Sequence, residues 1–98
     1  MYRREDDSLE IDVGTAKTPQ QLHDLLSEAF QFPDYYGSNW DAFDECIRDI
    51  AVLSIIQISH FEMLRSRLPR EADLMSDCLE DFAQSHEPKI TVRINPRR

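Results

Sequence analysis

The feature that most constrains the fold is the segment AVLSIIQI, residues 51–58, which is nearly continuously apolar and rich in branched side chains. Branched residues favour strands, and a strand that is apolar on both faces is typical of a parallel sheet covered on both sides. We therefore predict that residues 51–58 form the central strand of the protein.

Two other segments have the character of strands. Residues 9–13, LEIDV, alternate apolar and acidic side chains, and residues 89–94, KITVRI, end the patterned part of the chain. Helical patterns separate the three strands in the order β-α-α-β-α-α-β, which excludes hairpins and predicts right-handed parallel crossovers. We expect an α/β fold with a three-stranded parallel sheet packed by about four helices. With 98 residues, the chain predicts a single domain, 1–98, with frayed tails at 1–8 and 95–98.

The first helix has the clearest signals. Thr18, Pro19 and Gln21 supply an N-cap, a proline at the first helical position and a capping-box partner. Pro33 is expected to end this helix, because a proline disfavours helical geometry in the residue before it. One apolar stripe is predicted to face the core, made of Leu22, Leu25, Leu26, Ala29 and Phe30.

A loop, PDYYGS, leads into a second helix. Gly37 can supply a positive φ in this loop, and Ser38 or Asn39 can cap the helix. Of the two loop tyrosines, we expect Tyr36 either to plug the core or to remain at the surface with Tyr35. The apolar face of the helix is predicted to span about 80° and to contain Trp40, Phe43, Ile47 and Ile50, flanked by Cys46. Residues 59–68 predict a short helix or turn that Pro69 breaks. Residues 70–85 predict a last helix with Leu74, Met75, Cys78, Leu79 and Phe82 inward.

Negative charge is concentrated in two of these helices. The chain carries 11 basic and 19 acidic residues, for a net charge of −8; residues 34–50 hold five acids and one base, and residues 71–87 hold six acids and no Lys or Arg. On the second helix, Asp41, Glu45 and Arg48 fall within about 60° of one another, flanked by Asp44 and Asp49. The last helix has a second acidic patch, made of Asp73, Asp77, Glu80 and Asp81.

Part of this charge opposes helix stability. Asp41 and Glu45 are like charges at i, i+4, and Asp49 lies near the helix C-terminus, where the dipole disfavours an anion. The plain alternative is that the stripe is the solvated side of an amphipathic helix. A cationic protein partner explains the cost better, and the exposed tyrosines beside the stripe suit an interface.

The composition also excludes several classes of function. A net charge of −8 argues against nucleic acid or an anionic membrane as partner. No apolar segment is long enough to cross a bilayer and no leader is visible, so we expect a soluble, cytoplasmic protein. Cys46 and Cys78 fit free thiols better than the alternative of a disulfide. His23, His60 and His86 are scattered along the chain and fit solvated or capping residues better than ligands. No cofactor or metal motif is present, and the lack of a nucleophile, base and oxyanion set makes an enzyme acting through Asp41 and Glu45 the weaker alternative.

The segments LHDLLSEAFQFPDYYGSNWDAFDECI and DFAQSHEPKITVRI resemble the barstar-like ribonuclease inhibitors over about residues 9–94. The resemblance implies a 1:1 complex in which the protein plugs the active site of a small, basic, guanyl-specific ribonuclease of the barnase type. It implies loop contacts by Tyr35 and Gly37, and a binding helix that starts with Asn39, Trp40 and Asp41.

Further along, the resemblance places Glu45 where the family has the aspartate that substitutes for a substrate phosphate. Asp81, or Glu80 if the alignment shifts by one residue, matches an acid on the last helix. Glu45 reaches about 1.5 Å further than aspartate, Asp44 and Ile50 replace aromatic residues, and Trp40 replaces a leucine. These departures predict a cognate nuclease other than barnase, such as the toxin of an interbacterial toxin and immunity pair. The alternative is an acidic binding module for another basic protein.

Overall fold

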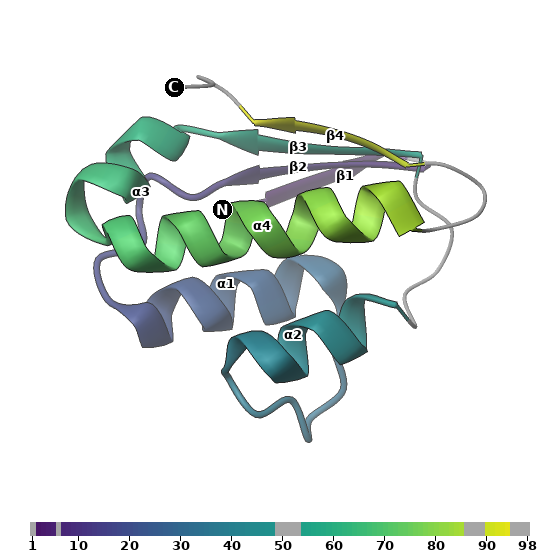
Figure 1. Ribbon diagram of the computed structural model, residues 1–98, viewed down its shortest axis with the longest axis horizontal. Coiled ribbons are helices and arrows are strands. Elements are labelled where there is room, and N and C mark those ends of the chain that lie inside the picture. The colour runs from purple at the N-terminus through teal and green to yellow at the C-terminus, as the bar shows by residue number, and fades with distance from the viewer. Residues whose placement is uncertain (1, 6, 49–53, 86–89, 95–98) are drawn as a thin grey trace.

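The computed structural model describes residues 2–5, 7–48, 54–85 and 90–94. One sheet lies above a layer of helices: α1 and α4 run beneath the sheet, α2 lies farther from it, and α3 sits at one end (Figure 1). The elements follow in the order β1 (Tyr2–Glu5), β2 (Ser8–Asp12), α1 (Pro19–Phe30), α2 (Trp40–Ile47), β3 (Ile55–Ser59), α3 (Phe61–Arg67), α4 (Pro69–Ser85) and β4 (Thr91–Ile94).

The sheet has four strands in the order β1-β2-β3-β4, and it is mixed. β2, β3 and β4 are parallel, as predicted, and their register places Leu9 opposite Ile56 and Ile56 opposite Val92. β1 is antiparallel to β2, so the prediction of a three-stranded sheet without hairpins is wrong. Residues 2–5 form a strand where the sequence predicted a frayed start. The sequence YRRE gave no sign of it, because all four side chains are exposed and only backbone pairing with β2 makes them a strand.

The helices cover one face of the sheet fully. α1 and α4 run along this face (Figure 1). The side chains with almost no exposed surface are those of Leu9 and Ile11 in β2 and of Ile56 and Ile58 in β3. On the other face, the alternate residues of β3, Ile55, Gln57 and Ser59, are only half-buried. β3 is an interior strand, as predicted, but the prediction that both of its faces are covered is wrong. Residues 51–53 of the predicted strand lie outside the described residues.

The ends of α1 follow the predicted capping chemistry. Thr18 Oγ1 accepts a hydrogen bond from the Gln21 amide at 3.1 Å, and Gln21 Oε1 accepts one from the Lys17 amide at 2.9 Å. α1 ends before Pro33, at Gln31, which adopts the left-handed conformation. The predicted stripe faces the core, with Leu25 partly buried at its margin.

The last helix differs slightly from its prediction. The break predicted at Pro69 is confirmed, because α3 ends at Arg67 and Leu68, the residue before the proline, has φ −133° and ψ 67°. Pro69 itself is the first residue of α4, one residue earlier than predicted and at a position where its missing N–H costs nothing. Leu74 and Cys78 are half-buried, while Ala72 and Ser76 take buried positions on the helix. The face of α4 that contacts the sheet is therefore rotated from the predicted one, and Cys78 lies toward α2.

Candidate functional site

The loop between α1 and α2 presents one tyrosine to solvent and buries the other. Tyr35 is 82% exposed. Tyr36 is half-buried, its hydroxyl lies 2.6 Å from His23 Nδ1, and its ring lies 4.9 Å from that of Phe32. Burial raises the pKa of Tyr36 well above its usual range. Tyr36 therefore anchors the loop to α1 and leaves Tyr35 available to a partner.

The entry into α2 is built by three consecutive residues. Asn39 is the N-cap, and its Oδ1 accepts a hydrogen bond from the Ala42 amide at 2.7 Å. The positive φ expected at Gly37 occurs instead at Ser38, whose φ is 52°. Gly37 is needed for a different reason: a Cβ there would lie 3.2 Å from Asn39 Nδ2, the atom that donates to the Gly37 carbonyl. The loop backbone is thus packed against the cap of α2.

Trp40 joins the start of α2 to two other helices. Its indole N–H donates to Glu71 Oε1 of α4 at 3.0 Å, and its ring lies 4.5 Å from the ring of His23 in α1. His23 is 3% exposed, so the prediction of a solvated or capping residue is wrong for this histidine. Burial lowers the pKa of His23, although the carboxylates of Glu71 and Asp24 oppose that effect. His60 is exposed, as predicted, and pairs with Asp12 at 3.0 Å, while His86 lies outside the described residues.

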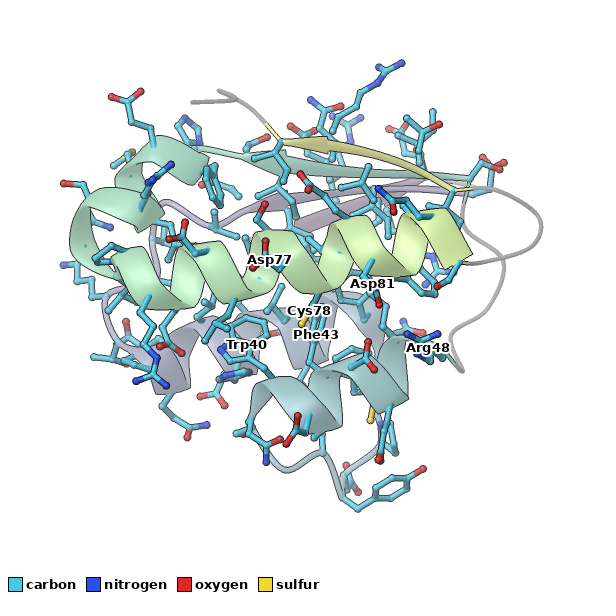
Figure 2. The ribbon with its side chains drawn as sticks, viewed as in Figure 1. Trp40, Phe43, Arg48, Asp77, Cys78 and Asp81 are labelled. Atoms are coloured by element: carbon cyan, nitrogen blue, oxygen red, sulfur yellow. The ribbon has the colours of Figure 1, made fainter. Side chains whose placement is uncertain are left out.

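Carboxylates from α2 and α4 converge around Cys78, which points from α4 toward α2 in Figure 2. Burial raises the pKa of the Cys78 thiol to about 11, and neighbouring carboxylates add to the rise. These carboxylates belong to Asp44, Asp77, Asp81 and Asp41. Four members of the two predicted acidic patches, two on each helix, therefore lie near this thiol, and we call these four residues the acidic face; Glu45, Asp73 and Glu80 are not among them.

Arg48 is the basic residue within the acidic face. It caps the C-terminus of α2 and contacts one carboxylate on each helix: Nη2 lies 3.3 Å from Asp44 Oδ1 and 3.4 Å from Asp81 Oδ2. Figure 2 shows Arg48 and Asp81 together where α2 ends beside α4. Phe43 of α2 is fully buried, and its ring lies 5.9 Å from that of Phe30 of α1.

The remaining predicted site residues lie around the contacts of Arg48 with Asp44 and Asp81. Asp41 and Glu45 are exposed on α2, one turn apart, and Glu80 is half-buried on α4. Asp49, like Ile50 of the predicted apolar face, lies outside the described residues. The geometry thus joins Asp44 of α2 and Asp81 of α4 through Arg48, and it leaves Asp41 near the Cys78 thiol at the other end of α2. Tyr35 and Asn39 lie on the adjoining loop.

Four neighbours of the site were absent from the predicted binding set: His23, Glu71, Asp77 and Cys78. Spacing could have suggested His23, because it shares the i, i+3, i+7 pattern with Leu26 and Phe30 of the buried stripe. No local signal could have paired Glu71 with Trp40, since the two residues are 31 positions apart.

Other kinds of site find little support in the described residues. Within them, no group of three or more His, Cys, Asp or Glu side chains is arranged to hold a metal ion. Cys46 and Cys78 form no disulfide, in agreement with the favoured prediction. In the described part of the chain, no helix is long and apolar enough to span a membrane.

Comparison with known proteins agrees with this geometry. Residues 7–95 match the family model described as Barstar (barnase inhibitor). The chain belongs to the barstar family. A relative in Bacillus subtilis (strain 168), named "Putative ribonuclease inhibitor YrdF", is 36% identical over 78 residues, which cover 79% of this chain and 82% of that protein. The resemblance predicted from the sequence is confirmed, and the fourth strand, β1, lies outside the stretch that matches the barstar model.

Proposed function

We propose that this barstar-family protein is a cytoplasmic immunity protein that inhibits a small basic ribonuclease of the barnase type. The observation that carries the proposal is the acidic face: in a chain of this family, two helices direct carboxylates toward one surface beside an exposed tyrosine. The description of the family and the name of the relative support ribonuclease inhibition.

Inhibition would work by occupying the RNA-binding groove. A ribonuclease that binds RNA presents Arg, Lys and His to the phosphates, and a preorganised set of carboxylates can take the place of those phosphates without offering a bond to cleave. One inhibitor would occlude one enzyme. The proposed binding surface takes in the loop, α2 with the two residues that follow it, and α4, and it contains Tyr35, Gly37, Asn39, Trp40, Asp41, Asp44, Glu45, Arg48, Asp49, Glu80 and Asp81.

Rigidity of the loop and of α2 supports this role. Tyr36 is tied to His23, Asn39 caps α2, and Trp40 is tied to Glu71, so the side chains that would meet the enzyme project from fixed backbone. A preordered surface loses little conformational entropy on binding. The net charge of −8 would also attract a basic enzyme over long range and speed association, an effect that salt screens.

One observation favours a second candidate function. Glu45 is exposed on α2 and stands where the resemblance implies an aspartate, so its longer side chain suits a groove of a different depth. The second candidate is therefore a binding module for another basic protein, including a toxin nuclease of different specificity. An enzyme is less consistent with the structure, because Asp41 and Glu45 are both exposed and an acid/base pair needs an enclosed site.

The test of inhibition is direct. Purified protein is titrated into a barnase-type ribonuclease that cleaves a fluorogenic RNA. In a second assay, the protein and the ribonuclease are co-expressed in bacteria, and growth is scored. We expect cleavage to stop near one equivalent and growth to be rescued. Full cleavage at a large excess of the protein, with every ribonuclease tried, would leave the second candidate in its place.

A further inference from the structure

Arg48 occupies a place that a partner's cation would need. Its guanidinium contacts Asp44 through Nε and Nη2, at 3.4 and 3.3 Å, and Asp81 through Nη2 at 3.4 Å. It is the single base among the five acids of residues 34–50, and residues 71–87 of α4 and beyond contain no Lys or Arg. Two carboxylates of the acidic face are thus already paired in the free protein.

We propose that Arg48 is an internal counter-cation that a partner must displace, and that it thereby sets the affinity and specificity of the acidic face. This inference rests on the proposed function, since it concerns how the same surface receives a cationic protein. A partner arginine that reaches Asp44 and Asp81 meets an occupied site, and its binding is weakened by the strength of the Arg48 contacts.

The geometry suits displacement better than a structural strut. Charge-assisted N–H···O contacts that hold tightly are about 2.7–2.9 Å long, whereas those of Arg48 are 3.3–3.4 Å. The side chains of Arg48, Asp44 and Asp81 are 45%, 40% and 68% exposed, so water can replace each contact. Exposed ion pairs of this kind add little to stability. Phe43 and the hydrogen bond between Trp40 and Glu71 already fix α2 against the other helices.

The need to displace Arg48 also favours some partners over others. A guanidinium can bind two carboxylates at once through its fork of donors, whereas a lysine ammonium acts as a compact point charge. When either residue must displace Arg48, a partner arginine placed between Asp44 and Asp81 therefore gains more binding free energy than a partner lysine. The acidic face is therefore tuned toward basic proteins that present arginine at this point.

The test compares Arg48→Gln with Arg93→Gln. Arg93 is exposed on β4 opposite Gln57 of β3, on the sheet face away from the buried Ile56 and Ile58, and its replacement changes the net charge equally. Two probes are used in buffer of low ionic strength. Binding of a hexa-arginine peptide is monitored by the fluorescence of Trp40, the single tryptophan. Binding of a barnase-type ribonuclease is monitored by inhibition of its RNA cleavage. Circular dichroism confirms folding, and Arg48→Lys serves as a second variant that keeps the charge but loses the fork.

We expect Arg48→Gln to bind the peptide at least threefold more tightly than Arg93→Gln, with Arg48→Lys in between. The gain should vanish when Asp44 and Asp81 are both replaced by asparagine. Equal or weaker binding by Arg48→Gln would overturn the inference. If Arg48→Gln bound the peptide more tightly but the protein inhibited no ribonuclease, the role of Arg48 would stand and the proposed function would be refuted. If the protein inhibited a ribonuclease but Arg48→Gln increased neither peptide binding nor inhibition, the proposed function would stand and the role of Arg48 would be refuted.

Discussion

Replacing Tyr36 with phenylalanine should destabilise the protein by about 1–3 kcal/mol. The ring would keep its packing against Phe32, so the variant removes only the hydroxyl that lies 2.6 Å from His23 Nδ1. His23 is 3% exposed, and a buried nitrogen that loses its hydrogen-bond partner costs about that amount of free energy. For a domain of this size, each kcal/mol lowers the melting temperature by about 4–8 °C.

Tyr35→Phe provides the matched control. It removes the same atom from a side chain that is 82% exposed, where substitutions change the free energy of unfolding by about 0.5 kcal/mol or less. Both variants can be measured by urea denaturation, with Trp40 fluorescence and far-ultraviolet circular dichroism as probes. If the two variants unfolded at the same urea concentration, the hydrogen bond between Tyr36 and His23 would not anchor the loop.

Three other predictions follow from the described contacts. The free energy of unfolding should fall as pH drops below about 6.5. The reason is that the pKa of His23 is lowered in the folded state, so the unfolded state binds the proton at a higher pH. A His23→Gln variant should lose this part of the pH dependence. With Cys46 replaced by alanine, Cys78 should react with iodoacetamide about tenfold faster per pH unit up to pH 10, since its pKa is about 11 and thiolate is the nucleophile; a rate that levels off near pH 9 would contradict this value. Phe43→Ala should cost about 3–5 kcal/mol because the side chain is fully buried between the helices, and a loss below about 1 kcal/mol in urea denaturation would mean that α2 packs differently.

The sequence predicted the elements whose determinants are local. Thr18, Pro19 and Gln21 start α1 through contacts within four residues, and the apolar stripe of α1 needs only the helical period. β1 could not be predicted in this way, because its residues 2–5 are all exposed and become a strand only by pairing with β2.

The candidate site shows the same division. The carboxylate stripe on α2 follows from the helical period, and so does the acidic patch on α4. Whether the two sets of carboxylates meet depends on how α4 is rotated about its axis relative to α2. The pattern predicted this rotation slightly wrongly, because it placed Cys78 inward. The contact between Arg48 and Asp81 spans 33 positions, so only the fold could bring the two residues together.

The acidic face is the proposed ribonuclease-binding surface, and the inhibition constants of matched variants show whether it is. The inhibition constant against a barnase-type ribonuclease is compared for the native protein, Asp41→Asn, and Glu62→Gln, an exposed acid on α3 that carries the same charge change away from the face. Loss of a hydrogen bond to a charged group costs about 1.5–3 kcal/mol, so Asp41→Asn should weaken inhibition about ten- to hundredfold or more, while Glu62→Gln changes it less than threefold. Equal inhibition constants for the two variants would contradict the account.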